Sequence, residues 1–382
     1  MTDYDLVLAG GEVIDPAQNV HGRRDIAFAD GKVAAIEEHI APERAARLLD
    51  VSGSHVVPGL VDIHSHFFYG FTPISRDPRT DIVPTGVTCS VDAGTAGSEN
   101  FTNLREFVMK PSALRLYAFL NAEVLGMAAR RYTDERMPFA HPDKAAGMVK
   151  RNRETIVGVK VQLPGSQSPY VDDSIALLDC GRRAARDAGV PMMVHIDGGI
   201  EIDELVGRLE PGDIITHCFQ GREPSVLTES GLHPAVRRAV ERGVLLDLAP
   251  AGRNHFAWRV AAAVCKEGYF PNTISSDYAT APRGVHGFMR SLPEAMSMML
   301  SLGMPLDDVV AAATTTPASA LGLGDRHGTL QVGRAGDAAV LRLDQVSDEF
   351  PDMEGGSRVL DEVLTPRVTV LGGEIVWESS DE

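Results

Sequence analysis

The chain has 382 residues, 44% of them hydrophobic, which is enough for a large core or for a barrel with a small additional domain. Its 53 acidic and 36 basic residues give a net charge of −17, which argues against nucleic acid or an anionic membrane as a partner, because both attract positive surface. Four scattered cysteines without a Cys-x-x-Cys pair, an acidic N-terminus and the lack of an apolar stretch of about 20 residues predict a cytoplasmic protein without a membrane span or disulfides.

The two ends of the chain share one character. Residues 4–52 contain short apolar runs, two of which flank Asp30-Gly31, a turn signal typical of a β-hairpin. A second set of short runs lies between Gly336 and Trp377. Neither end is long enough to fold comfortably alone, so we expect one small β-sandwich domain built from residues 1–55 and 330–382.

The middle of the chain alternates between strand and helix patterns. Continuous apolar runs are typical of parallel strands buried on both faces. The runs are Val56–Ile63, Gly86–Val91, Arg115–Leu120, Ile156–Leu163, Val190–Ile196, Asp213–His217, Gly243–Leu248 and Asn272–Ser276. Segments with helical spacing lie between them, for example Asp173–Ala188, Pro234–Glu241 and Phe256–Lys266.

Eight such strands predict an α/β fold, a (β/α)8 TIM barrel, over residues 56–329. A doubly wound open sheet is the alternative. That fold would more naturally carry a glycine-rich phosphate loop after its first strand, where this chain has His-x-His.

Polar residues that can hold a metal end several of these runs. The first run stops in Asp62-x-His64-x-His66, and residues i and i+2 of a strand point to the same face. Further candidates end later runs: Lys160, His195, His217 and Asp277. The carboxyl ends of barrel strands open onto one face, so these side chains should surround one cavity. A lone histidine on an apolar run is usually a core residue, but the repetition favours a metal site.

These residues resemble the amidohydrolase superfamily, which includes dihydroorotases, hydantoinases and ureases. The resemblance extends over nearly the whole chain, from Val57-Pro58-Gly59-Leu60-Val61-Asp62 to the strand Ala338-Ala339-Val340-Leu341. Within the superfamily, Val91-Asp92-Ala93-Gly94 and Gly158-Val159-Lys160-Val161 are most similar to dihydroorotase-like deacetylases.

The resemblance implies a site with two divalent metal ions, zinc being the best match to a nitrogen-rich set of ligands. His64, His66 and Asp277 would bind one ion, and His195 and His217 the other. Lys160 would be carboxylated by CO2 (N6-carboxylysine) and would bridge the ions together with a hydroxide, because an unmodified lysine is cationic and repels metal. A lysine that binds a substrate anion directly is the alternative.

The resemblance also implies a reaction. The bridging hydroxide would attack an amide or ester carbonyl, with Asp277 as general acid and base. The substrate would be a small anionic acyl compound, an N-acyl or O-acyl derivative of a carboxylic acid. Ring opening of a cyclic amide, as in dihydroorotases and hydantoinases, is the alternative. Nucleobase deamination is disfavoured by Lys160, and a purely structural role by the complete set of six metal-binding residues.

Three further residues could contact the substrate. Arg283 follows Asp277 by six positions and could clamp a carboxylate, or form a salt bridge at the rim. His286 could donate to the substrate or cap its loop, and His255 follows the seventh strand and could reach the cavity. A homo-oligomer is compatible with the sequence, which does not determine the oligomeric state.

Overall fold

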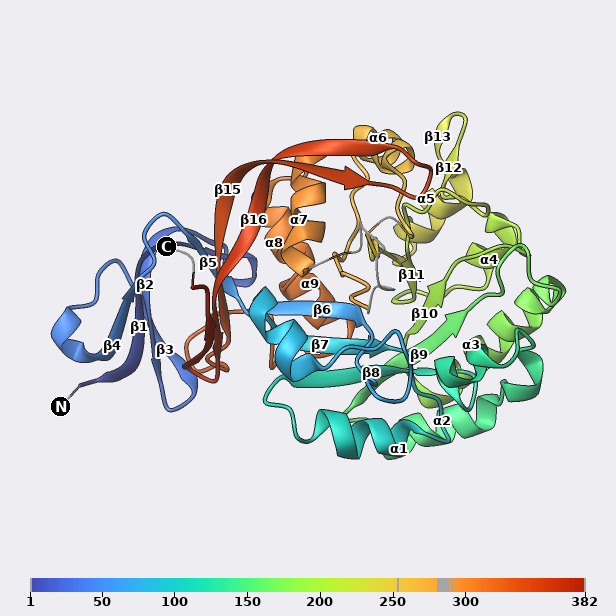
Figure 1. The fold of residues 1–382 in the computed structure, drawn as a ribbon, viewed down its shortest axis with the longest axis horizontal. Helices are drawn as coiled ribbons and strands as arrows, with labels where there is room; N and C mark the ends of the chain where they lie inside the picture. The colour runs from blue at the N-terminus through green and yellow to red at the C-terminus, as the bar shows by residue number, and fades with distance from the viewer. Residues whose placement is uncertain (1, 253, 280–288, 290, 381–382) are drawn as a thin grey trace.

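The structure is a computed structural model that describes residues 2–252, 254–279, 289 and 291–380 (Figure 1). Its larger part is built on a curled parallel sheet, and the polypeptide passes from one strand to the next in order. The strands, in sheet order, are β6 (Leu60–Ser65), β7 (Val87–Ala93), β8 (Arg115–Asn121), β9 (Ile156–Gln162), β10 (Met192–His195), β11 (Ile214–Thr216) and β14 (Leu245–Asp247). Seven of the eight predicted strands are therefore present as a parallel sheet.

The eighth predicted segment, residues 272–276, closes this sheet without being a regular strand. On one side the Leu248 amide donates to Thr273 O at 3.0 Å. On the other side the Asp277 amide donates to His64 O at 2.7 Å, and the His66 amide to Tyr278 O at 3.1 Å. The last segment thus bridges both edge strands, β14 and β6, and completes the predicted TIM-like barrel.

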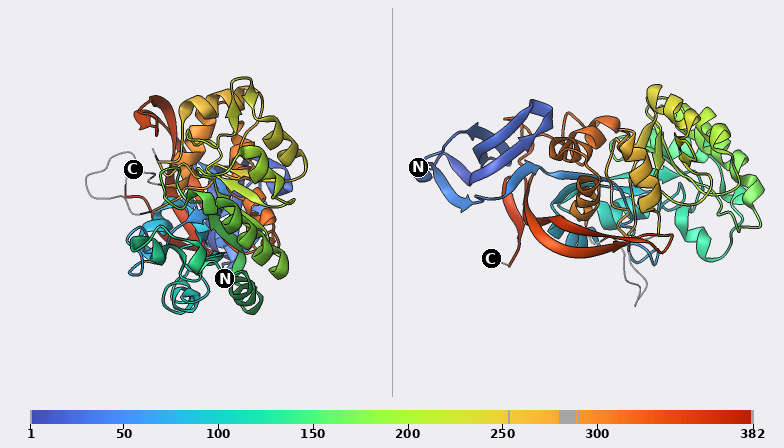
Figure 2. Two further views of the ribbon diagram at one scale, coloured as in Figure 1. Left: turned by 90° about the vertical axis from the view of Figure 1, so that its right-hand side faces the viewer. Right: turned by 90° about the horizontal axis from the view of Figure 1, so that it is seen from above.

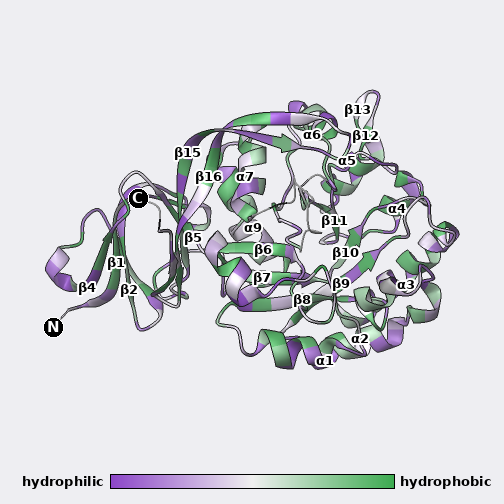
Figure 3. Ribbon diagram, in the orientation of Figure 1, coloured by the Kyte–Doolittle hydropathy of each residue, from purple (hydrophilic) through white to green (hydrophobic). Residues whose placement is uncertain are grey.

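Helices surround this sheet (Figures 1 and 2). They are α1 (Phe101–Leu104), α2 (Pro142–Arg151), α3 (Ser174–Ala188), α4 (Ile202–Gly207), α5 (Pro234–Glu241), α6 (Trp258–Lys266), α7 (Leu292–Ser301), α8 (Leu306–Ala312) and α9 (Thr315–Ala320). The barrel strands are mostly hydrophobic, whereas the helices alternate in hydropathy, as expected for elements with one buried face (Figure 3). The predicted helices near 173–188, 234–241 and 256–266 are confirmed as α3, α5 and α6.

Both ends of the chain contribute to one mixed sheet beside the barrel, as the sequence predicts. Its order is β17 (Glu374–Glu378), β16 (Ser357–Leu371), β15 (Ala338–Pro351), β5 (His55–Pro58), β1 (Tyr4–Asp15), β2 (Val20–Ala29) and β3 (Lys32–Glu37), with β4 (Ala45–Asp50) paired to β1. Leu8, Phe28, Val56, Val340 and Val370 belong to the buried core of this sheet.

The first apolar run of the sequence serves both sheets. The predicted strand Val56–Ile63 is divided at Gly59, so that β5 joins the terminal sheet and β6 begins the barrel. A Cβ at Gly59 would lie only 2.1 Å from Thr88 Oγ1, so this close approach of two segments requires glycine. The Gly59 amide also donates to Asp337 O at 2.9 Å, which ties the junction to the C-terminal strands.

The hairpin β15–β16 reaches far beyond the terminal sheet and crosses the barrel helices α7 and α6 (Figure 1). The Leu364 amide donates to Ser297 Oγ of α7 at 2.8 Å. At the tip of the hairpin, the buried Asp352 accepts the first amide of α6, that of Trp258, at 3.0 Å. The domain boundary predicted near residue 330 stays a prediction. Residues on its C-terminal side contact the barrel helices α7 and α6 as well as the terminal sheet.

Two further predictions from the sequence concern membrane spans and disulfides. None of the helices in the described part of the chain has the length and apolar character that a membrane span requires. All four cysteines are buried and free, in agreement with the prediction of no disulfides. The cytoplasmic location stays a prediction.

The contact at the hairpin tip generates a stability prediction. Asp352→Ala removes the acceptor of the buried Trp258 amide at the start of α6, so we expect the free energy of unfolding to fall by about 1 to 2 kcal/mol. Denaturant unfolding measures the loss. Asp361→Ala, an exposed carboxylate on the same hairpin, is the control and should change little. Equal effects of both variants would contradict a capping role for Asp352.

Candidate metal centre

The structure brings the six predicted metal-binding side chains together at the carboxyl ends of the barrel strands. Five of them line a cavity of about 250 Å³: His64, His66, Lys160, His195 and Asp277. The sixth, His217, lies against His195, with its Nε2 atom 3.0 Å from His195 Nδ1. All six are buried, although they are spread over more than half of the chain. Their roles as ligands stay predictions; their convergence is a feature of the fold.

A first group consists of His64, His66 and Asp277, whose ligand atoms lie within 4.8 Å of one another. Asp277 Oδ1 lies 3.2 Å from His66 Nε2 and 3.5 Å from His64 Nε2. Burial alone would favour the protonated carboxyl, but the surrounding imidazoles hold the pKa of Asp277 well below its usual value. This group therefore offers one carboxylate and two imidazole nitrogens.

A second group consists of His195, His217 and His255, again with ligand atoms within 4.8 Å. The rings of His217 and His255 are stacked with centroids 4.2 Å apart. The second oxygen of Asp277, Oδ2, lies 3.9 Å from His217 Nε2 and 4.0 Å from His255 Nε2. Asp277 thus faces both groups, one with each oxygen.

His255 is the residue whose position most revises the sequence interpretation. It was predicted as a substrate contact, and the structure places it among the imidazoles of the second group. No spacing signal marks it, since it lies in the loop after β14 and not at the end of a strand. Its neighbour Asn254 also lines the cavity. The other two predicted substrate residues, Arg283 and His286, lie outside the described residues.

The histidines of both groups are suited to binding a cation. Burial lowers the pKa of His64, His195 and His217 well below the usual value, so these rings are neutral near pH 7. Neutral imidazole offers a lone pair, which is the form that binds zinc and related ions. The donor chemistry of five imidazoles and one carboxylate therefore fits a pair of divalent metal ions.

Hydrogen bonds behind the rings orient them. Thr216 donates its hydroxyl to Asp247 Oδ2 at 2.7 Å, so its oxygen accepts from His64 Nδ1, also at 2.7 Å. This arrangement places the His64 proton on Nδ1 and leaves Nε2 free for a cation. His217 Nδ1 likewise lies 2.6 Å from Ala249 O, a carbonyl that can only accept.

His66 is held in a comparable way, by Thr95. Its Nδ1 atom lies 2.8 Å from Thr95 Oγ1, and the Thr95 amide donates to Asp92 Oδ1 at 2.6 Å. These supporting residues were not found from the sequence. Asp247 lies near the end of the apolar run Gly243–Leu248 and is the last residue of β14, so the strand-end criterion that singled out the ligands could have found it.

Asp62 connects the first and last segments of the barrel. It accepts the His64 amide at 3.2 Å and the Ser276 amide at 3.1 Å, and also the Ser276 hydroxyl. The bonds fix β6 against the segment that carries Asp277, so the two sides of the first group cannot separate easily.

The backbone is strained where it delivers two of the side chains. His217 has φ 62° and Asp277 has φ 51°, both in the left-handed region. Such conformations cost non-glycine residues about 1–3 kcal/mol and are typical of functional sites.

Lys160 lies on β9 and lines the same cavity. Its Nζ atom is 3.3 Å from His64 Nε2, and its side chain is buried. Burial lowers the pKa of Lys160 to about 7, against the opposing attraction of Asp277 and Asp247. A sizeable fraction of this amine is therefore neutral near pH 7, unlike an exposed lysine.

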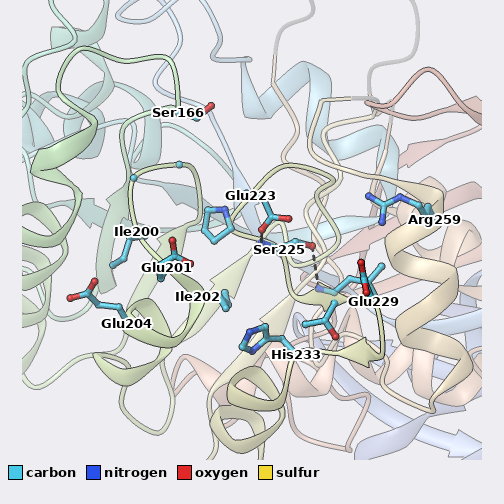
Figure 4. Close-up of a pocket in the computed structure, with 15 residues that line it drawn as sticks. Ser166, Ile200, Glu201, Ile202, Glu204, Glu223, Ser225, Glu229, His233 and Arg259 are labelled. Carbon is cyan, nitrogen blue, oxygen red and sulfur yellow. Dashed lines mark hydrogen bonds between the residues drawn. The ribbon is translucent and has the colours of Figure 1, made fainter.

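A larger hollow of about 900 Å³ lies among the loops that follow β9, β10 and β11 (Figure 4). Its lining includes the carboxylates of Glu201, Glu204, Glu223 and Glu229. The lining of this hollow includes one histidine, His233. The imidazoles converge in the smaller cavity instead.

Comparison with known proteins agrees with this geometry. The model of the amidohydrolase family matches residues 55–376. The chain belongs to the amidohydrolase family. A deacetylase of Agrobacterium fabrum is 33% identical to it, over 92% of this chain and 86% of that protein.

Two solved structures are similar over nearly the whole chain. A dihydroorotase superposes with a TM-score of 0.86 and 31% identity and covers 98% of both chains. An adenine deaminase superposes with a TM-score of 0.87 and 25% identity, over 99% of this chain and 100% of its own. Together with the two imidazole groups, these relationships identify a metal-dependent amidohydrolase whose relatives include deacetylases.

The bonds behind His64 generate a prediction about metal affinity. Thr216→Val keeps the size of the side chain but removes the acceptor for His64 Nδ1, so we expect metal affinity to fall about ten- to hundredfold. Competition with a chromogenic chelator measures it. Thr102→Val, at an exposed position on α1, is the matched control. Unchanged affinity in Thr216→Val would show that the hydroxyl does not orient the ligand.

Proposed function

We propose that this amidohydrolase removes an acyl group from a small carboxylic acid, by hydrolysis of an N-acyl amide or an O-acyl ester. The observation that carries the proposal is the position of Asp277, between two groups of imidazoles and at the wall of the cavity. The similarity to the Agrobacterium deacetylase supports this choice of bond.

The proposed site holds two divalent metal ions, best matched by zinc because of the nitrogen-rich set of ligands. His64, His66 and Asp277 hold one ion, and His195 and His217 hold the other. Metal ions here would activate water as a nucleophile and polarise the scissile carbonyl. His255 completes the second imidazole group and is a further candidate ligand, in addition to its predicted contact with the substrate.

We also propose that Lys160 is carboxylated by CO2. A neutral amine is the form that attacks CO2, and the lowered pKa of Lys160 supplies that form near neutral pH. The product is an anionic carbamate, which can join the two groups where a cationic ammonium would repel metal. The 3.3 Å separation between Lys160 Nζ and His64 Nε2 supports this placement.

Asp277 is the proposed general base and acid. Its carboxylate accepts a proton from the attacking water while the water oxygen bonds to the acyl carbon. The same proton is then donated to the leaving nitrogen or oxygen as the C–N or C–O bond breaks. The products are a free acid and an amine or alcohol, so one water is consumed per bond.

Two other reactions are compatible with the same groups. Ring opening of a cyclic amide is supported by the similarity to a dihydroorotase, and deamination of a purine by the similarity to an adenine deaminase. The first uses the same attack on an amide carbonyl. The second is disfavoured by Lys160, since nucleobase deaminases usually hold one metal without a bridging lysine.

A substrate panel distinguishes these reactions. The protein is stripped with a chelator, reconstituted with zinc in bicarbonate and assayed with four kinds of compound. These are N-acetyl amino acids, O-acetyl hydroxy acids, cyclic amides (dihydroorotate and hydantoins) and adenine. We expect turnover of the acetylated acids, loss of activity on metal removal and recovery on reconstitution. Turnover confined to the cyclic amides or to adenine would replace the proposal.

The role of Lys160 has its own test. Lys160→Ala should abolish activity, and small carboxylic acids such as propionate should partly restore it by standing in for the carbamate. Metal content, measured alongside, should fall in the variant. Lys144→Ala, at an exposed position on α2, is the control and should keep full activity. Lost activity with full metal content and no rescue would instead indicate a lysine that binds substrate.

A further inference from the structure

Two arginines share one carboxylate behind the loop that follows β8. Arg136 Nη1 lies 3.1 Å from Glu123 Oε1, and Arg130 Nη2 lies 3.6 Å from the same oxygen. The side chain of Glu123 is 1% exposed, that of Arg136 9% and that of Arg130 13%. The group therefore carries a net positive charge that is almost entirely removed from water.

The hydrogen bonding of these guanidinium groups is incomplete. Within the described part of the chain, the buried Nε and Nη2 atoms of Arg130 have no hydrogen-bond partner, and neither has Nε of Arg136. A buried charged donor without an acceptor is costly, so such atoms usually have an acceptor when the protein is in its working state. Nε and Nη2 form one edge of a guanidinium, the edge that binds both oxygens of a carboxylate at once.

Arg130 lies one helical turn from a residue that lines the catalytic cavity. Arg130 belongs to the 3-10 helix Gly126–Arg131, and Met127 of that helix lines the cavity. Residues i and i+3 of a 3-10 helix lie one above the other, so Arg130 shares the face of Met127. The helix is held against Thr95, since the Met127 amide donates to Thr95 O at 3.0 Å.

Two further contacts keep this helix close to the metal centre. A Cβ at Gly126 would lie 2.4 Å from Thr95 O, so only glycine permits the helix to approach this closely. Thr95 itself holds His66 through its hydroxyl. The Ala122 amide, directly after β8, donates to Lys160 O on the neighbouring strand β9 at 3.0 Å. The loop that leads from β8 to this helix therefore starts beside Lys160.

The electrostatics agree with this placement. Burial and the nearby Arg136 lower the pKa of Arg130 to about 9, against the attraction of Glu123, so Arg130 is still cationic at neutral pH. A positive subsite here can attract an anion although the whole chain carries a charge of −17.

We propose that Arg130 binds the carboxylate of the substrate, and that Glu123 and Arg136 position it. The inference deepens the proposed function, on which it rests, by naming the free carboxylate as the group that the enzyme recognises. The acyl group then lies toward the imidazoles and the carboxylate toward the loop after β8. Arg130 would select carboxylic acids over their neutral amides.

The test uses matched pairs of an N-acetyl amino acid and its primary amide, on metal-reconstituted protein. We expect the wild type to prefer the acid. In Arg130→Gln, KM for the acid should rise about ten- to hundredfold while KM for the amide stays within about twofold, because only the acid loses a charge-assisted contact. Arg130→Lys keeps the charge without the planar fork and should recover part of the preference.

Controls separate recognition from folding. Metal content and thermal unfolding should match the wild type in both Arg130 variants. Arg153→Gln, an exposed guanidinium that donates to Ala188 O, removes the same charge elsewhere and should leave both KM values unchanged. An equal KM for acid and amide in the wild type, a test that needs no variant, would overturn the inference, as would an acid preference that persists in Arg130→Gln.

Binding measurements keep this inference apart from the proposed reaction. Calorimetric titration of N-acetylglycine and N-acetylglycinamide into metal-loaded protein reports recognition even when neither compound is turned over. Tighter binding of the acid than of the amide, with the difference lost in Arg130→Gln, would support the carboxylate subsite. A lack of turnover would count against deacylation and not against the subsite. Equal binding of both compounds would overturn the carboxylate subsite. If turnover is observed in the same experiment, the proposed deacylation is still supported.

Discussion

The closure of the barrel is the constraint on which the rest of the site depends. Hydrogen bonds from residues 273–278 to both edge strands bring Asp277 next to His64 and His66, from opposite ends of the barrel sequence. Asp62 strengthens the same junction through Ser276. Without this closure the carboxylate and the imidazoles would belong to separate edges of an open sheet, and no single cavity would contain both groups.

The charge of the centre is balanced on a local scale. Burial keeps several imidazoles neutral, and the carboxyl group of Asp277 faces both groups with one oxygen each, so the cavity offers imidazole lone pairs and one carboxylate to a cation. Carbonyl and hydroxyl acceptors behind the rings turn the free nitrogens inward. The left-handed backbone at His217 and Asp277 shows that the surrounding structure supplies stability to keep these side chains in place.

The terminal sheet is connected to the catalytic part at two points. At Gly59 a single extended run passes from one sheet into the other, so the strand that carries His64 is continuous with the terminal sheet. At the far side, the β15–β16 hairpin caps α6, which follows the loop carrying His255. Both attachments stabilise segments that deliver residues to the cavity, which gives the non-catalytic sheet a part in holding the site.

The sequence by itself determined the features that depend on local pattern. Continuous apolar runs located the barrel strands, helical spacing located α3, α5 and α6, and polar residues at strand ends identified His64, Lys160 and Asp277 as members of one site. Tertiary structure alone decided the division at Gly59, the reach of the β15–β16 hairpin, the place of His255 among the imidazoles and the pairing of Arg130 with Glu123. These depend on contacts between segments far apart in the chain, and periodicity within one element carries no information about such contacts.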